Sequence, residues 1–245
     1  MSVLVVTGTC TEVGKTVVTA AVAALAVAAG RRVAVLKPAQ TGVGPGEPGD
    51  ADTVAALVPG VTTAELVRYP EPLAPATAAA RSGAEPVRAE AVAEAVWRLA
   101  GTHDLVLVEG AGGLLVRLNA EGQTLADVAV LLSAPVLVVA RPDLGTLNAT
   151  ALTAEALRTR GLSPAGVVVG SWPDRPDLAM RCNLTDLSAM GAGPLAGPVP
   201  RGSGTLDPRA FADVARRSLA PRLGGVWQVG AGAGIRPEGE PARTG

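Results

Sequence analysis

Residues 8–16 of the chain read Gly-Thr-Cys-Thr-Glu-Val-Gly-Lys-Thr and match the pattern G-x-x-x-x-G-K-[ST] except for one additional residue between the two glycines. The apolar residues 2–7 before them predict a buried strand, and the alanine-rich residues 16–29 after them predict a helix that Gly30 ends. In such a turn, backbone N–H groups and the helix N-terminus can surround an anion. The dinucleotide fingerprint G-x-G-x-x-G is excluded because five residues separate Gly8 from Gly14. We therefore expect a phosphate-binding loop. The alternative is a glycine-rich turn that fits by chance.

The loop contains one of only two lysines in the chain. Lys15 is expected to reach the β and γ phosphates of a nucleotide, and the hydroxyl of Thr16 to ligate Mg²⁺. Besides Lys15 and Lys37, the other basic residues among the 21 are arginines. A lysine at each of these two positions therefore indicates a need for a compact ammonium group.

The alternation of strand and helix continues along the chain. Further strands are predicted over residues 32–37, 104–109, 135–140, 165–170 and 195–199, and helices over residues 52–58, 88–99, 124–133, 146–160, 178–190 and 208–219. This alternation predicts an α/β fold like that of P-loop NTPases, with three layers and a mostly parallel sheet covered by helices on both faces. Residues 41–49 are expected to form a binding loop, and the proline-rich residues 70–87 to cover part of the same edge. We expect one domain over residues 1–225 and a disordered Gly- and Pro-rich tail over residues 226–245.

Charge and composition limit the classes of partner. The 245-residue chain has a formal net charge of -1 and no basic stripe, which argues against nucleic acid. The longest nearly uncharged run, residues 17–30, is shorter than the roughly 20 residues that span a bilayer, and no signal-peptide pattern is present. We expect a cytoplasmic protein without a membrane partner. The single histidine, His103, excludes multi-histidine metal sites, and Cys10 and Cys182 lack the spacing of metal ligands.

Two predicted strands end in a charged residue at the rim that carries the phosphate-binding loop. Lys37 ends the second strand and is followed by Pro38 and, further on, Thr41. Glu109 ends the apolar residues 105–108 and precedes Gly-Ala-Gly-Gly, which resembles a Walker B strand whose carboxylate holds Mg²⁺ directly or through water. Because strand ends in open α/β sheets face the ligand crevice, we expect both groups in the site. The alternatives are an exposed lysine and a merely solvated carboxylate.

Three predicted helix starts carry polar residues with less specific signals. Asp50 and Asp52 begin a short helix, where one is expected to be an N-cap and the other could be a third Mg²⁺ ligand. Residues 124–127 form a capping box with Asp in place of Glu. Residues 143–148, Asp-Leu-Gly-Thr-Leu-Asn, begin a helix whose free N–H groups could receive a carboxylate, or which could be an ordinary capped helix start.

Taken together, these segments resemble the ATP-dependent dethiobiotin synthetase family from Val3 to about Arg201. The resemblance rests on residues 11–16, on Lys37-Pro38 with Thr41, on Asp52, and on residues 108–113 and 144–148. Enzymes of that family close the ureido ring of dethiobiotin from 7,8-diaminononanoate, CO₂ and ATP with Mg²⁺, and they act as homodimers. The resemblance therefore implies a cyclo-ligase of biotin biosynthesis.

The resemblance also implies a division of labour among residues. Lys37, Lys15 and Thr11 would be catalytic, and Thr16, Asp52 and Glu109 would hold Mg²⁺. Thr41 and Glu12 would contact the substrate, and the helix start at Gly145, Thr146, Leu147 and Asn148 would bind the carboxylate of a substrate that lies mainly in the other subunit. The nucleotide contacts would come from Glu12, Val13, Gly14, Lys15, Thr16, Val17, Asp52, Glu109, Gly110, Ala111, Gly112, Gly170, Ser171, Val199, Pro200 and Arg201.

One departure and two competing classes remain. Many members of the family carry an adenine-reading Asn where this chain has Gly170-Ser171, which leaves its nucleotide base selectivity open. A P-loop switch ATPase of the partitioning type, acting on a protein partner, commonly has an extra early lysine in its loop, and residues 9–13 contain none. The related amide-forming synthases need a second, glutaminase module, for which only residues 219–245 remain.

Overall fold

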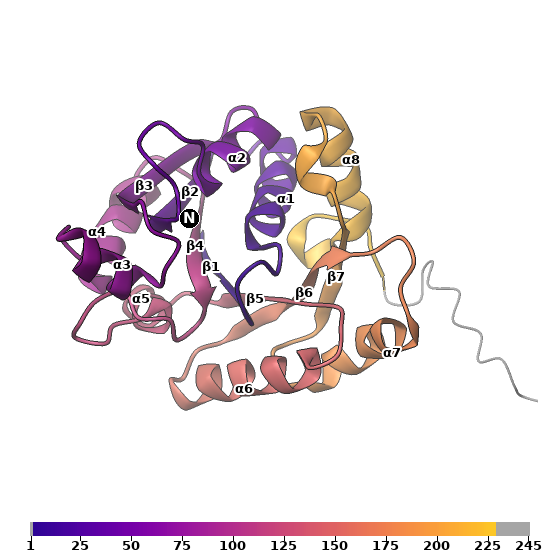
Figure 1. Ribbon diagram of the computed structural model, residues 1–245. Coiled ribbons are helices and arrows are strands. Elements are labelled where there is room, and N and C mark those ends of the chain that lie inside the picture. The colour runs from indigo at the N-terminus through magenta and orange to yellow at the C-terminus, as the bar shows by residue number, and fades with distance from the viewer. Residues whose placement is uncertain (1, 229–245) are drawn as a thin grey trace, which may run out of the picture.

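The computed structural model describes residues 2–228, which form one seven-stranded sheet with helices on both sides (Figure 1). The strands are β1 (Ser2–Gly8), β2 (Val33–Thr41), β3 (Thr62–Tyr69), β4 (Leu105–Gly113), β5 (Val136–Ala140), β6 (Pro164–Trp172) and β7 (Leu195–Pro200). Their order is β3-β2-β4-β1-β5-β6-β7, and every neighbouring pair is parallel. Strands β2, β3 and β4 lie on one side of β1, and strands β5, β6 and β7 lie on the other. The carboxyl end of β1 is therefore at the point where the direction of strand addition reverses, and open α/β sheets bind ligands at such switch points.

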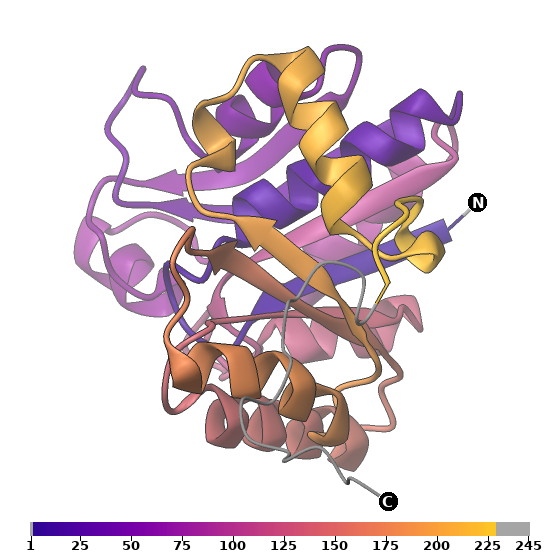
Figure 2. The ribbon, with the colours of Figure 1, turned by 90° about the vertical axis from the view of Figure 1, so that its right-hand side faces the viewer.

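Within residues 2–228, eight α-helices connect and cover the strands. They are α1 (Lys15–Ala28), α2 (Asp50–Leu57), α3 (Pro75–Ser82), α4 (Ala89–Ala100), α5 (Leu125–Leu132), α6 (Thr146–Thr159), α7 (Leu178–Asp186) and α8 (Pro208–Ser218), with short 3₁₀ turns at Leu187–Ala189, Ser203–Thr205 and Pro221–Leu223. Helices α1, α2 and α8 cover one face of the sheet and α3 to α7 the other (Figure 2). The predicted three-layer α/β fold is confirmed. Over residues 2–228, no helix has the length and apolar character needed to cross a membrane.

The central strands supply side chains to two separate hydrophobic cores. On β1, Val5 packs into the core beneath α4 and α5, whereas Leu4 and Val6 pack beneath α1 and α8. On β4, Val106 packs into the first of these cores and Leu107 into the second. Successive strand side chains point to opposite faces, so a strand covered on both faces has to be apolar at every position. This explains the continuous apolar runs of the sequence.

The structure contains two elements that the sequence analysis did not predict. The first is the edge strand β3, whose residues are mostly half-buried, and the second is helix α3, which begins at Pro75 within the proline-rich segment. Strand β2 also continues past residue 37 as far as Thr41. The predicted tail, residues 226–245, lies outside the described residues from residue 229 onward.

Candidate functional site

The phosphate-binding loop joins β1 to α1 at the centre of the sheet. Gly14 precedes the helix with a φ of 91°, a left-handed conformation that favours glycine, and no side chain caps the helix N-terminus. Glu12 also has a positive φ, of 55°. A Cβ on Gly14 would lie 2.3 Å from the carbonyl oxygen of Gly170 on β6, so the end of β6 packs directly against the loop. The free N–H groups at the start of α1 are therefore available to an anion.

Lys37 lies at the centre of a buried ionic cluster beside this loop. Its Nζ is 2.9 Å from Oε1 of Glu109 and 2.5 Å from Oδ2 of Asp50, and it donates to the carbonyl of Gly110 at 3.2 Å. The hydroxyl of Thr16 donates to the same Oε1 of Glu109 at 2.8 Å. The side chains of Lys37 and Glu109 are only 4% and 1% exposed. The strand-end lysine and the strand-end carboxylate are therefore in direct contact with each other and with the loop.

The charges of the cluster depend on one another. Burial disfavours the charged form of Lys37, but the carboxylates of Glu109 and Asp50 outweigh it and raise the pKa of Lys37 above its ordinary value. Burial alone would raise the pKa of Asp50, but the ammonium of Lys37 outweighs burial, so the pKa of Asp50 is lowered. The pKa of Lys15 is also lowered, first by burial and then by the neighbouring Lys37 charge. Lys37 is therefore firmly cationic, and Lys15 lacks a comparable anionic partner.

The oxygen atoms around Thr16 fit a hard divalent cation. Oε2 of Glu109 is buried and has no hydrogen-bond partner in the structure, although an unsatisfied buried carboxylate oxygen is costly. Within residues 2–228, no group of three or more His, Cys, Asp and Glu side chains could hold a metal ion alone. Mg²⁺ in nucleotide sites uses one or two carboxylates together with phosphate oxygens and waters. The set of Thr16, Glu109 and Asp50 matches that donor chemistry.

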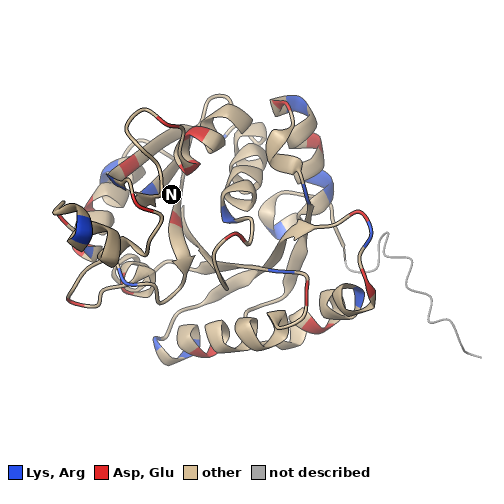
Figure 3. Ribbon diagram, viewed as in Figure 1, with Lys and Arg blue, Asp and Glu red and all other residues tan. Residues whose placement is uncertain are grey.

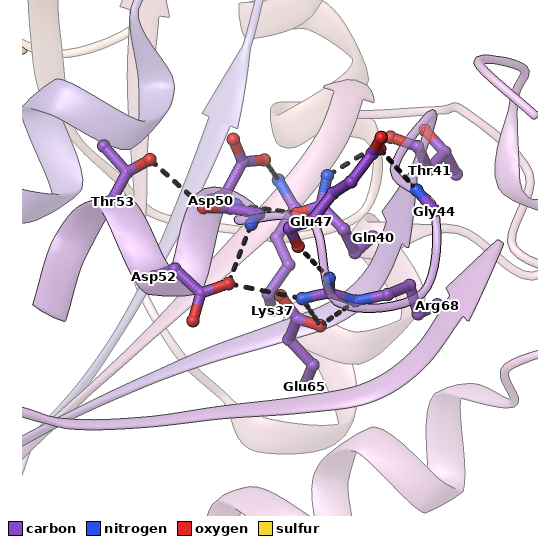
Figure 4. Close-up of polar contacts among 11 residues, drawn as sticks. Lys37, Gln40, Thr41, Gly44, Glu47, Asp50, Asp52, Thr53, Glu65 and Arg68 are labelled. Atoms are coloured by element: carbon purple, nitrogen blue, oxygen red, sulfur yellow. Dashed lines mark hydrogen bonds and ion pairs between the residues drawn. The ribbon is translucent and has the colours of Figure 1, made fainter. Parts of the chain in front are cut away.

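Asp50 and Asp52 point in different directions from the start of α2 (Figure 4). Asp50 faces the cluster, and its backbone N–H donates to Oε1 of Gln40 at 2.9 Å. Asp52 closes a capping box by accepting from the N–H of Gly49 at 2.8 Å, and its Oδ2 is 3.4 Å from Arg68 on β3. The N–H of Gly49 and the Arg68 side chain lower the pKa of Asp52. The structure thus brings Asp50 to Lys37 and places Asp52 outside the cluster.

A cleft of about 880 Å³ opens in front of the cluster. Both lysines line it, together with the expected site residues Thr11, Glu12, Gly14, Thr16, Val17, Thr41, Ala111 and Gly112. Its wall also contains Ala39, Gln40 and Val116, which the sequence analysis did not single out. Asp50, one of the two candidate aspartates, and the segment Pro72, Leu73, Ala74 and Pro75, from the proline-rich residues that were expected to cover this edge, complete the wall. The only sequence signal for that segment was its position among the prolines of residues 70–87. In the view of Figure 3, acidic and basic residues are interspersed over the outer helices and form no stripe of one sign.

The remaining expected residues do not line this cleft. Ser171 and Arg201 lie at the ends of β6 and β7, where Nε of Arg201 is 3.5 Å from the Ser171 hydroxyl. Val199 and Pro200 belong to β7. At the end of β5, Gly145 precedes α6 with a φ of 91° and without a side-chain cap. The neighbouring Leu144 is 82% exposed.

Comparisons with known proteins agree with this geometry. A family model described as an AAA domain matches residues 2–209. The chain is 64% identical to the ATP-dependent dethiobiotin synthetase BioD of Streptomyces coelicolor, over 94% of this chain and 97% of that protein. It is 68% identical to the protein of the same name from Saccharopolyspora erythraea, over 93% of this chain and 99% of the relative.

Solved structures resemble the fold at much lower identity. MinD of Pyrococcus horikoshii, determined with Mg-ADP, is 17% identical with a TM-score of 0.55, over 88% of this chain and 94% of that one. A ParA family ATPase from Chlorobium tepidum is 14% identical with a TM-score of 0.53, over 91% and 95%. At such identities the likeness concerns the P-loop fold alone.

Proposed function

The chain belongs to the ATP-dependent dethiobiotin synthetase family, and from this premise we propose that the cleft around Lys37 joins CO₂ to 7,8-diaminononanoate. Its activity is ATP-dependent dethiobiotin synthesis, a step of biotin biosynthesis. The residue roles, the divalent ion and the dimer described below are part of the proposal. The observation that carries it is the convergence of Lys15, Lys37 and Asp50 on one cleft beside the phosphate-binding loop, with the buried Glu109 in contact with Lys37.

The proposed reaction has three steps. One amine of the substrate adds to CO₂ and loses a proton, which gives a carbamate. A carbamate oxygen then attacks the γ-phosphorus of ATP, and the bond to the bridging oxygen breaks and releases ADP. Finally, the second amine attacks the carbonyl carbon of the mixed anhydride, which expels phosphate, loses a proton and closes the ring. No step needs an imidazole base, which agrees with the position of the single histidine, His103, outside the lining of the cleft.

The chain's own groups position the reactants and neutralise their charge. We assign Lys37 to the carbamate and the phosphoryl group in transfer, and Lys15 to the β and γ phosphates. Thr11 and Glu12 would contact phosphate and substrate, and Thr41 would hydrogen-bond the carbamate or an amine. Preorganised charge of this kind stabilises a transition state without reorganisation during the reaction. Burial supports this role for Lys37, because its ammonium cannot move far.

Mg²⁺ would be held by Thr16 and Glu109. For the third ligand we propose Asp50 in place of Asp52, because Asp50 lies in the cluster and Asp52 caps α2. The ion would supply charge neutralisation between the phosphate oxygens. Oε2 of Glu109, which is buried without a hydrogen-bond partner, supports a role for this side chain in holding the ion.

The nucleotide would lie along the loop toward β6 and β7. Val13, Gly14 and Val17 would follow its phosphates on one side, and Gly110, Ala111 and Gly112 on the other. Gly170 and Ser171, with backbone groups around Val199, Pro200 and Arg201, would face the base. The alternative nucleotide-dependent protein switch is not favoured by any contact in the structure.

The start of α6, residues 145–148, would bind the substrate carboxylate across a homodimer. Its uncapped left-handed turn and the exposed Leu144 support this assignment. The test of the whole proposal is phosphate release with ATP and Mg²⁺, with diaminononanoate and bicarbonate omitted in turn. Strict dependence on both is the expected result. Turnover indifferent to both would reject the ligase and favour a switch ATPase.

A further inference from the structure

We propose that Asn183 on α7 is a positioning residue for substrate selection, because it holds the turn that presents the start of α6 to the substrate carboxylate. This inference rests on the proposed function and deepens it. Asn183 lies 35 residues beyond Asn148 in the sequence. It is outside all the segments on which the family resemblance rests.

The amide of Asn183 bridges two elements through buried hydrogen bonds. Its Nδ2 donates to the carbonyl of Pro142 at 2.8 Å and to that of Asp143 at 3.2 Å. Both acceptors belong to the turn between β5 and α6, and the Asp143 carbonyl also accepts from the N–H of Thr146 at 3.2 Å. One side chain thus fixes two consecutive peptide groups immediately before the proposed carboxylate site.

Asn183 is also unusual within its own helix. It is the one buried residue of α7, at 5% exposure, although helices usually bury apolar side chains. Leu178 at the start of α7 is 69% exposed. A buried amide without hydrogen-bond partners would be costly. The hydrogen bonds of Asn183 therefore fix the position of α7 relative to the turn before α6.

The start of α6 is held less firmly by apolar packing than its far end. The buried residues of its first half are Thr146 and Thr150, and neither hydroxyl has a hydrogen-bond partner. Leu147 packs against the core there but is only partly buried, whereas the buried apolar side chains of α6, Ala154 and Leu157, lie in its second half. The Asn183 amide therefore adds a polar constraint at the end that would receive the carboxylate.

The expected consequence is selective. If the amide is lost, the turn before α6 relaxes and the N–H groups of residues 145–148 no longer converge on the substrate carboxylate. Binding of the carboxylate then weakens, because it depends on the orientation of these groups. The effect should appear for a substrate that has a carboxylate and not for one that lacks it. Nucleotide binding occurs at the phosphate-binding loop and should not change.

The test compares 7,8-diaminononanoate with 2,3-diaminononane, which has the same vicinal diamine and no carboxylate. In Asn183→Leu, which keeps the number and branching of the side-chain heavy atoms and removes both amide N–H donors, we expect kcat/KM for the carboxylate substrate to fall about tenfold. For the diamine it should stay within about twofold of the wild type. The KM for ATP should not change. Asn183→Ser, which is smaller and retains one donor, is measured in parallel and should show an intermediate loss.

Leu184→Ala is the matched control, because Leu184 packs against the same core from the same helix and leaves the amide in place. We expect it to lower the melting temperature without changing the preference between the two substrates. An equal loss of preference in Leu184→Ala, or an equal effect of Asn183→Leu on both substrates, would overturn the inference and leave the proposed function intact. A wild-type enzyme that does not distinguish the two substrates would instead refute the carboxylate site itself, and the inference with it.

Discussion

Nζ of Lys37 lies 2.9 Å from Oε1 of Glu109, between side chains that are 4% and 1% exposed. The register of β2 and β4 explains this contact, because Leu36 is paired with Val108 and the next residue of each strand is therefore brought to the same level. Buried ion pairs do not in general stabilise a fold more than apolar residues would, since desolvation opposes their attraction. The ionic cluster around Lys37 is therefore better explained by a role in the proposed reaction than by a contribution to the stability of the fold.

Replacing Lys37 tests that chemistry. In Lys37→Ala we expect phosphate release to be abolished while ATP affinity, measured by calorimetry, changes little, because Lys15 and the loop carry the phosphate contacts. Since Glu109 and Asp50 lose their cation, unfolding free energy should also fall by about 3 kcal/mol or more.

Lys37→Arg separates charge from shape. It retains the positive charge but not the compact ammonium, so it should keep more stability than Lys37→Ala and remain inactive. Near-normal turnover in Lys37→Ala would remove this lysine from the mechanism. Normal turnover in Lys37→Arg would leave only its charge as the requirement.

A pair of isosteric variants distinguishes the two aspartates of α2. Asp50→Asn removes a charge from the cluster, so the Mg²⁺ concentration for half-maximal turnover should rise by about tenfold. Asp52→Asn weakens the capping box and the contact with Arg68, and should lower stability by about 0.5–1 kcal/mol while the Mg²⁺ requirement stays normal. The measurements are a Mg²⁺ titration of turnover and denaturant unfolding. The reverse pattern would assign the ion to Asp52.

The fold was predictable where a strand is buried on both faces. The runs that became β1, β4 and β5 are continuously apolar, and this pattern follows directly from two covering layers. The edge strand β3 was missed because its half-buried residues include Glu65 and Arg68, which form an ion pair with each other and interrupt the apolar pattern. Helix α3 was missed because prolines surround it, although Pro75 at its first turn is favourable.

The candidate site was predictable where a motif fixes backbone geometry. Lys15 and Thr16 follow from the loop, and Lys37 and Glu109 from their positions at strand ends. Asp50 was not separable from Asp52, because both lie in the first turn of α2 and only tertiary contacts orient them. The cleft wall at residues 72–75 belongs to the proline-rich segment that was expected to cover this edge, but which of its residues line the cleft depends on tertiary packing.

A surface ion pair makes stability depend on pH. The Arg32 side chain and backbone N–H bind both carboxylate oxygens of Asp104 and hold the pKa of that carboxyl far below its usual range. A lowered folded-state pKa contributes stability above the ordinary value of about 3.9 and loses it as the pH falls through the folded value. We expect Asp104→Asn to lower the melting temperature at pH 7, and the difference from wild type to shrink on acidification below that ordinary value.

Asp174→Asn is the control for that measurement, because Asp174 is exposed and forms no ion pair among residues 2–228. It should follow the wild-type curve. High salt should reduce the Asp104 effect, since exposed charges are screened. A difference that persists unchanged to the lowest pH would show that Asp104 acts through packing and not through charge.

The contact between β6 and the phosphate-binding loop leads to a prediction about Gly170. A Cβ at this position would lie 2.1 Å from the carbonyl oxygen of Val13 and 2.6 Å from a methyl carbon of Val139, so the loop would have to move. Overpacking of this kind costs about 1–3 kcal/mol. In Gly170→Ala we therefore expect ATP affinity to fall at least tenfold, measured by calorimetry. Gly101→Ala is the matched control, because Gly101 has a helical φ of -65° and its added Cβ would approach other atoms no closer than 3.4 Å. It should bind ATP normally, and unchanged affinity in Gly170→Ala as well would mean that the position of the loop does not depend on β6.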